Sequence, residues 1–186
     1  MALINASIYF DHCNISKSFE NQRIRMGLPE EARFDFKKIS RIVALGMNII
    51  SKNVYLAEPK NSGNGFNSFI KSLEDSGFKT TIKTPKVIKT DDGEKNKCDF
   101  DVEITRDICK TLFTGVSCQE FIIFSGDSDF SRLKEDMKEY GARLTIVSAL
   151  DRISSESTNI SDRLILLEDL DRIAKGLYYF VQKPKS

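Results

Sequence analysis

The sequence predicts an α/β fold with a mostly parallel sheet of about five strands, covered by helices on both faces. Two observations carry this prediction. Short apolar runs of strand length alternate with segments that repeat their apolar residues at helical spacing. Two of the apolar runs also end abruptly in polar residues, which is typical of the carboxyl edge of a buried parallel sheet.

The elements of the first half are assigned from this periodicity and from turn residues. A strand is expected over 3–10 because the run is apolar and ends in Asp11. Residues 15–33 are polar and irregular, which predicts a loop or a short helix. Asp35 is a suitable N-cap for the next helix, and Gly77 a suitable C-terminal stop for the one after it. The expected elements are helices over 36–47 and 66–75, strands over 53–57 and 78–88, and polar turns over 58–65 and 90–97.

The second half contains the most clearly defined strand, EFIIF, at 120–124. The segment that follows it turns at Gly126 into a helix that Gly141 ends. The other expected elements are helices over 101–112, 154–162 and 168–178, a strand over 143–148 and a short strand-like piece over 164–167. We find no repeat or linker, so residues 1–186 are expected to form a single domain.

The bulk composition is that of an ordinary globular protein. Of the 186 residues, 40% are hydrophobic and 30% charged, and the net charge of +1 provides no general attraction to nucleic acid. The sequence has no apolar run long enough to span a bilayer and no signal-peptide pattern at its start, so a cytoplasmic protein is expected. Four cysteines without CxxC spacing and a single histidine, His12, argue against a structural zinc site and for reduced thiols.

Aspartates lie where the chemistry of a parallel sheet is expected. Asp11 ends the first strand, and Asp127 and Asp129 follow the EFIIF strand. Asp101 opens a helix, with Asp107 six residues later. Each of these residues alone is more simply explained as a turn or helix-capping residue. Ligands of such sheets, however, bind beyond the carboxyl ends of the strands, and two apolar strands ending in acids favour a site there.

Clustered carboxylates repel one another unless some are protonated or a cation neutralises them. Mg²⁺ and Mn²⁺ prefer oxygen ligands, and either ion can activate water and stabilise charge on a phosphate. The pattern therefore favours a divalent metal site. His12 could instead act as a general acid or base beside Asp11, although a histidine at a strand end is more often structural.

Three motifs resemble those of the NYN domain family, the PIN-like nucleases that include the LabA-like proteins. The run IYFDHCN (8–14) is similar to the D-x-x-N opening of that family. The run KCDFDVEITRD (97–107) is similar to its K-G-x-V-D-x-x-L-x-x-D segment. The run FIIFSGDSDFSRL (121–133) is similar to its S-G-D-x-D-F-x-x-L motif, and SDRLILLEDL (161–170) resembles its closing segment. Order and spacing agree over nearly the whole chain.

The resemblance implies a PIN-like three-layer α/β/α sandwich that cleaves RNA through metal-activated water. It places Asp11, Asp101 and Asp127 at the metal, with Asp129 and Asp107 at accessory acidic positions. We therefore assign a catalytic role to Asp11, Asp101, Asp127 and Asp129, and metal binding to Asp11, Asp101, Asp127 and Asp107. Asn14 and Ser125 fall on the polar positions around them. Cys98 replaces the family's usual glycine, and His12-Cys13 replaces a commoner small or acidic pair; neither departure removes a ligand that the resemblance implies.

Six lysines precede Asp101, at positions 79, 83, 86, 89, 95 and 97. They could contact phosphates, and we take Lys97 and Lys89, with Asn14 and Ser125, as candidate substrate-binding residues. Lysines on an exposed strand also prevent edge-to-edge pairing, and nearby acids dilute the charge, so a purely structural role stays open.

The function expected from the sequence is a Mg²⁺- or Mn²⁺-dependent endoribonuclease. Its expected partner is single-stranded or structured RNA, with no membrane, and a homodimer is left open. The alternative is a catalytically silent PIN-like scaffold or RNA-binding protein, which would not need the full set of acids. A metal-dependent phosphatase is a weaker third interpretation, because Asp11 is not followed by a second aspartate two residues later.

Overall fold

The central sheet of the computed structural model has six strands in the order β4-β3-β1-β7-β8-β9, and all its pairs are parallel. The structure describes residues 3–90, 93–114, 117–153 and 161–180. The sheet strands are β1 (Ile4–Asp11), β3 (Met47–Ala57), β4 (Lys79–Lys83), β7 (Glu120–Phe124), β8 (Arg143–Ser148) and β9 (Arg163–Leu166). The prediction of a mostly parallel sheet is confirmed, with six strands in place of about five.

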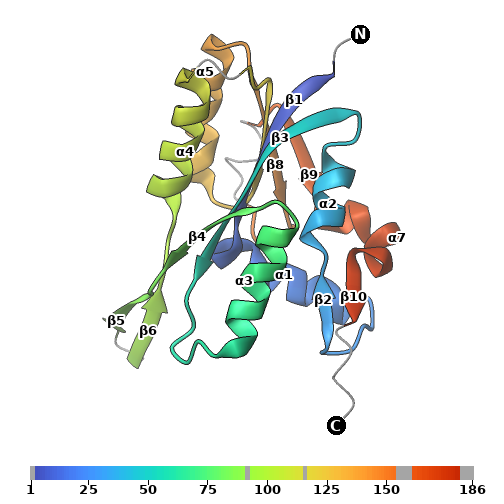
Figure 1. Cartoon of the computed structure of the whole chain (residues 1–186), viewed down its shortest axis with the longest axis vertical. Coiled ribbons are helices and arrows are strands. Elements are labelled where there is room, and N and C mark those ends of the chain that lie inside the picture. Colours follow the sequence, from blue (N-terminus) through green and yellow to red (C-terminus); the bar gives the residue numbers. More distant parts are fainter. Residues whose placement is uncertain (1–2, 91–92, 115–116, 154–160, 181–186) are drawn as a thin grey trace.

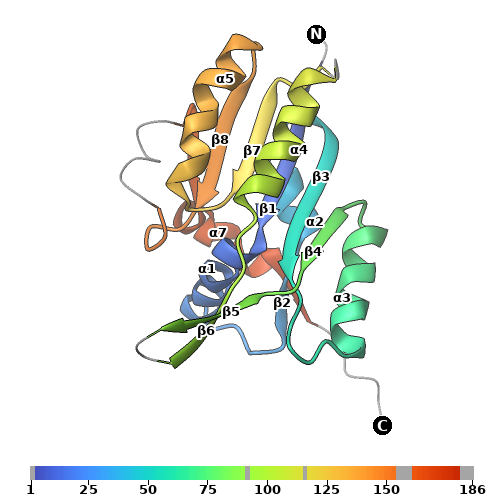
Figure 2. The same cartoon turned by 90° about the vertical axis from the view of Figure 1, so that its left-hand side faces the viewer.

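Helices cover both faces of the sheet, so the predicted three-layer α/β/α arrangement is confirmed (Figures 1 and 2). One face carries α4 (Asp101–Phe113) and α5 (Leu133–Glu139), the latter preceded by the 3-10 turn η1 (Ser128–Arg132). The opposite face carries α1 (His12–Arg25), α2 (Phe36–Val43), α3 (Asn64–Asp75) and α7 (Asp171–Ala174). In the described part of the chain, no helix is both long and apolar enough to cross a membrane.

Side chains of β1 alternate between two hydrophobic cores. Ile8 and Phe10 enter the core under α1 and α2, whereas Tyr9 enters the core under α4 and α5. Successive side chains of a strand point to opposite faces, so a strand buried on both faces needs a continuous apolar run. This is why the run at 3–10 predicted its strand correctly.

The helix α1 was not expected at this length. Its buried residues are Ile15, Ser18, Phe19 and Gln22, which have helical spacing. Two of the four are polar, so the apolar pattern that predicts a helix is missing from the sequence. The Nε2 of Gln22 donates to the carbonyl of Leu167 at 2.9 Å, a partner 145 positions away. The buried face of α1 is therefore satisfied by tertiary hydrogen bonds that local periodicity does not reveal.

The predicted strand at 78–88 is divided at Pro85, and the predicted polar turn that follows it is wrong. The ladder between β3 and β4 ends at Lys83, two residues before Pro85, which has no N–H to donate. The chain then forms an antiparallel hairpin of β5 (Lys86–Thr90) and β6 (Gly93–Lys97). This hairpin projects from the body of the molecule below the start of α4 (Figure 2).

The remaining differences lie at element ends. Asp35 caps α2 as predicted, since its carboxylate accepts from the Lys38 N–H at 2.8 Å, and α2 stops at Val43. Gly46 has φ +79° and leads directly into β3, which begins earlier than predicted. The predicted helix at 154–162 lies mainly outside the described residues. The predicted helix at 168–178 is a series of short turns, η2 (Leu167–Leu170), α7 and η3 (Lys175–Leu177), before β10 (Tyr178–Phe180) pairs with β2 (Ala32–Phe34).

Candidate metal centre

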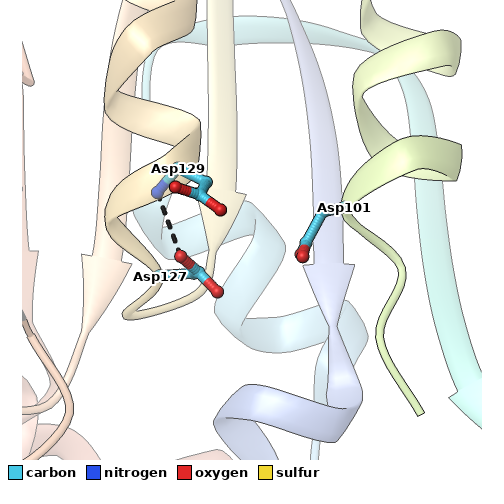
Figure 3. A group of neighbouring side chains, drawn as sticks. All are labelled: Asp101, Asp127 and Asp129. Carbon is cyan, nitrogen blue, oxygen red and sulfur yellow. Dashed lines mark hydrogen bonds between the residues drawn. The ribbon is translucent and has the colours of Figure 1, made fainter.

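Three aspartates converge beyond the carboxyl ends of the central strands. Asp101, Asp127 and Asp129 each offer a carboxylate oxygen, and these oxygens lie within 4.8 Å of one another. Asp101 belongs to the first turn of α4, Asp127 to the loop after β7, and Asp129 to η1. In Figure 3 the Asp101 carboxylate points across the gap toward the other two. Segments that are separated by a whole helix and a strand thus form one acidic group.

Asp11 lies beside this group and is buried, with 4% of its surface exposed. It ends β1 and caps α1: one carboxylate oxygen accepts from the Asn14 N–H at 3.3 Å. Its other oxygen accepts from the Ser125 hydroxyl at 3.2 Å. The chain starts in the middle of the sheet and adds strands outward on both sides, so β1 and β7 flank the point where strand order reverses. Such a point is where α/β sheets bind ligands.

Hydrogen bonds join the two strand ends that carry the acids. The Gly126 N–H donates to the Asn14 side-chain oxygen at 3.0 Å, and the Asp127 N–H donates to the Ser125 hydroxyl oxygen at 3.2 Å. The Asp129 N–H in turn donates to the Asp127 carboxylate at 3.0 Å. Asn14 and Ser125, which the sequence placed among the substrate-binding residues, are therefore engaged in positioning the acids.

The electrostatics of the group favour a cation. Burial raises the pKa of Asp11 to about 6, and the charges of Asp101 and Asp127 add to this increase against the hydrogen bonds it accepts. Burial also raises the pKa of Asp101, with contributions from Asp127, Asp99 and Asp129. Among the described residues, Asp101, Asp127 and Asp129 form no salt bridge with a lysine or arginine. No ion pair within the described chain therefore neutralises these three carboxylates, and the charge of Lys97 offsets only part of the increase in the pKa of Asp101.

Gly126 lets the loop after β7 pass close to a distant segment. A Cβ at this position would lie 2.2 Å from the Arg152 carbonyl oxygen and 2.9 Å from the Ser148 hydroxyl. Arg152 follows the whole of α5 and β8 in the sequence, so no local signal predicts this contact. The glycine is needed for close backbone approach and not for its φ, which lies outside the left-handed region.

The residues present fit a hard divalent cation. All the converging donors are carboxylate oxygens, which are the ligands that Mg²⁺ and Mn²⁺ prefer, and no described histidine or cysteine is part of the group. Each oxygen of Asp11 accepts a hydrogen bond and has a second lone pair. Asp101, Asp127 and Asp129 could hold the ion directly, with Asp11 beside them.

Asp107 lies away from this group. It follows Asp101 by six residues on a helix, which places it about 9 Å along the axis and about 120° around it. It is buried, and its carboxylate accepts from the Tyr55 hydroxyl at 2.9 Å and from the Arg106 guanidinium at 3.0 Å. The structure therefore separates Asp107 from the four acids with which the sequence grouped it, because helix geometry directs it to the sheet beneath α4.

The two candidate lysines point to different faces of the β5–β6 hairpin. Lys97 lines a pocket of about 370 Å³ together with Lys83, Lys86 and Ile88. Residues 86 and 88 share one face of β5, so Lys89 points to the other face, and the structure separates it from Lys97, with which the sequence grouped it as a substrate-binding candidate. The pocket also includes Asp99, two residues before Asp101, and the charges of Asp99 and Lys97 both act on the pKa of Asp101, so the pocket lies near the acidic group.

His12 is not part of the acidic group. Its ring packs against Phe36 and Phe69, with ring centroids 6.0 and 6.1 Å apart, and burial lowers its pKa to about 4. It is thus a neutral side chain packed on the aromatic core under α2 and α3, in agreement with a structural role.

Comparisons with known proteins agree with this fold. The sequence matches the NYN domain over residues 5–168. It is 30% identical over 147 residues to the low amplitude and bright protein LabA of Synechococcus elongatus, covering 74% of each chain. Its fold is similar to a crystal structure of a protein of unknown function from Vibrio parahaemolyticus, with a TM-score of 0.67 and 21% identity over 90% of this chain and 94% of that one.

Proposed function

Because this chain belongs to the NYN domain family, whose members are generally nucleases, we propose that it is a metal-dependent ribonuclease. The observation that carries the proposal is the convergence of Asp101, Asp127 and Asp129 within 4.8 Å at the strand-order reversal, with Asp11 beside them. Mg²⁺ or Mn²⁺ is the proposed cofactor and RNA the proposed substrate.

The acids have separate tasks in this proposal. Asp101, Asp127 and Asp129 would hold the cation, which, when bound, lowers the pKa of a water and stabilises charge on a phosphate. Asp11 contributes a fourth negative charge from a buried position. Asn14 and Ser125 hold the ends of β1 and β7 in register, so that the acids do not spread apart when they are ionised.

The second candidate is a catalytically silent protein that keeps the fold and binds RNA. The complete acidic group argues against it, because buried and clustered carboxylates destabilise a fold that does not use them. A silent protein would bind RNA without cleaving it and would not require a divalent cation.

Cleavage of labelled RNA by the purified chain tests the proposal. We expect cleavage with Mn²⁺ or Mg²⁺, none with EDTA, and at least about a 100-fold loss in Asp127→Asn and Asp101→Asn, since metal-assisted chemistry contributes several kcal/mol. Asp136→Asn is the matched control: it removes an exposed carboxylate of α5 outside the acidic group, and its activity should equal that of the native chain.

Three results would count against the proposal. Activity that survives both Asp101→Asn and Asp127→Asn would come from a contaminant or another site. RNA binding without cleavage, together with no binding of Mn²⁺ or Mg²⁺ by calorimetry, would favour the silent protein. Cleavage of DNA in preference to RNA would keep the metal chemistry and overturn the substrate.

A further inference from the structure

The pocket near the acidic group lies between one face of the β5–β6 hairpin, the end of β4 and the segment before α4. Lys86 and Lys97 lie directly opposite each other in the antiparallel ladder. Both line the pocket of about 370 Å³, as does Lys83 from the end of β4. The hairpin projects from the body of the molecule (Figure 2), and Lys86, Ile88 and Lys97 are exposed.

A like-charged pair at directly opposite positions destabilises a hairpin. The ammonium groups of Lys86 and Lys97 are therefore expected to separate, or to pair with nearby carboxylates. Lys97 is matched in part by Asp99, at a distance of 3.5 Å between the charged atoms and in an exposed position. In the part of the chain that the structure describes, Lys86 forms no salt bridge. The described base of the hairpin therefore carries an excess of positive charge.

Lys83 forms the third side of the pocket and makes three contacts with the start of α4 and the residues before it. Its ammonium group lies 2.6 Å from the Glu103 carboxylate, donates to the Asp99 carbonyl at 3.1 Å, and lies 5.0 Å from the centre of the Phe100 ring. These contacts tie the pocket to the start of α4, which carries Asp101. Ile88, 42% exposed, adds an apolar surface to the lining of the pocket.

Charge and shape together select the ligand. The pocket combines lysines with an apolar side chain, which suits an anion that also has an apolar part, and its lining reaches to Asp99, two residues before Asp101. Resting on the proposed function, we infer that this pocket binds a backbone phosphate of the RNA next to the phosphate at the acidic group, with the adjoining sugar against Ile88. Lys86 and Lys97 contact the phosphate, and Lys83 holds the wall of the pocket.

Lys86 and Lys89 of β5 point to opposite faces of the hairpin, and they also differ in cross-strand partner, since Lys86 lies opposite Lys97 and Lys89 opposite Glu94. Lys86 points into the pocket, whereas Lys89 lies on the opposite face, with equal charge and similar exposure. Lys89→Gln is therefore a matched control for Lys86→Gln. A role of Lys86 in stability alone predicts that its replacement lowers the melting temperature. Relief of the repulsion with Lys97 predicts an unchanged or higher one.

The test is binding of a short fluorescent single-stranded RNA to the full chain in EDTA, measured by anisotropy over a series of salt concentrations. Lys86→Gln should weaken binding about fivefold at low salt and reduce the slope of log K against log salt by about 0.7. Lys86→Gln with Lys97→Gln should reduce the slope by about 1.4. Lys89→Gln should leave both quantities unchanged.

Three outcomes distinguish a failure of the pocket from a failure of the proposed function. Equal losses in Lys86→Gln and Lys89→Gln would show general attraction to a basic hairpin and overturn the pocket. If Lys86→Gln binds RNA as tightly as the native chain and cleavage still depends on Asp127, the proposed phosphate pocket is wrong and the proposed nuclease activity stands. Lysine-dependent binding without any metal-dependent cleavage would support the pocket and overturn the nuclease.

Discussion

Replacing Gly126 with alanine tests whether the loop after β7 is held by backbone packing. The new Cβ would lie 2.2 Å from the Arg152 carbonyl oxygen, whereas Cβ atoms in proteins essentially never approach another heavy atom within 3.0 Å. The loop must therefore move by about 1 Å, and overpacking of this kind costs about 1–3 kcal/mol. For a chain of this length we expect the melting temperature to fall by about 3 to 10 °C.

The same displacement should weaken metal binding. The Gly126 N–H donates a hydrogen bond to Asn14, and Gly126 precedes Asp127 in the loop. A movement of this loop by about 1 Å therefore moves Asp127 away from Asp101. Calorimetry with Mn²⁺ should show at least about a tenfold loss of affinity, since binding sites of this kind require well-held ligands.

Gly65→Ala is the matched control for this prediction. Gly65 lies in α3, where an added Cβ would meet nothing within 4 Å, so alanine should stabilise the chain by about 0.5 kcal/mol. Circular dichroism on heating measures both variants. A melting temperature and a Mn²⁺ affinity of Gly126→Ala equal to those of the native chain would refute the prediction.

Three further predictions concern charge and hydrogen bonding. Asp11→Asn should stabilise the metal-free chain by up to about 3 kcal/mol at neutral pH, because the pKa of Asp11 is about 6 in the folded chain against an ordinary 3.8. This penalty is present above pH 6 and is lost as the pH falls toward 4. Denaturant unfolding measures it, and parallel plots of unfolding free energy against pH for the native chain and the variant would contradict it. His12→Phe should reduce the loss of stability between pH 6.5 and 4, since the folded state keeps the ring neutral while the unfolded state takes up a proton; an unchanged acid unfolding profile would argue against burial as the cause. Asp107→Asn should lower the free energy of unfolding by about 1 kcal/mol, because it weakens the contacts with Tyr55 and Arg106, and should leave the Mn²⁺ affinity within about twofold. A loss of Mn²⁺ binding in calorimetry would show that Asp107 belongs to the metal site.

Much of the fold could be predicted because strands buried on both faces need continuous apolar runs. The run at 3–10 and the run EFIIF both form strands at the centre of the sheet. α1 could not be predicted in this way, since Ser18 and Gln22 are buried and polar. Their partners are set by tertiary contacts, which local periodicity does not contain.

The hairpin shows the same limit at the level of single side chains. Six lysines are evident in the sequence, but only strand pairing decides which of them share a face. The division at Pro85 begins β5 at Lys86, and this register turns Lys86 and Lys97 to the pocket and Lys89 away from it. The predicted polar turn concealed this arrangement.

By itself, the sequence determined that acids follow buried strands and that Asp101 opens a helix, because strand and helix signals are local. Only the tertiary structure decided which acids meet. The packing of α4 beside the end of β7 brings Asp101 close to Asp127 and Asp129 at the strand-order reversal. Asp107 lies six residues further along α4 and therefore points toward Tyr55 instead. Spacing along a chain fixes direction within one element, whereas convergence between elements depends on how they pack.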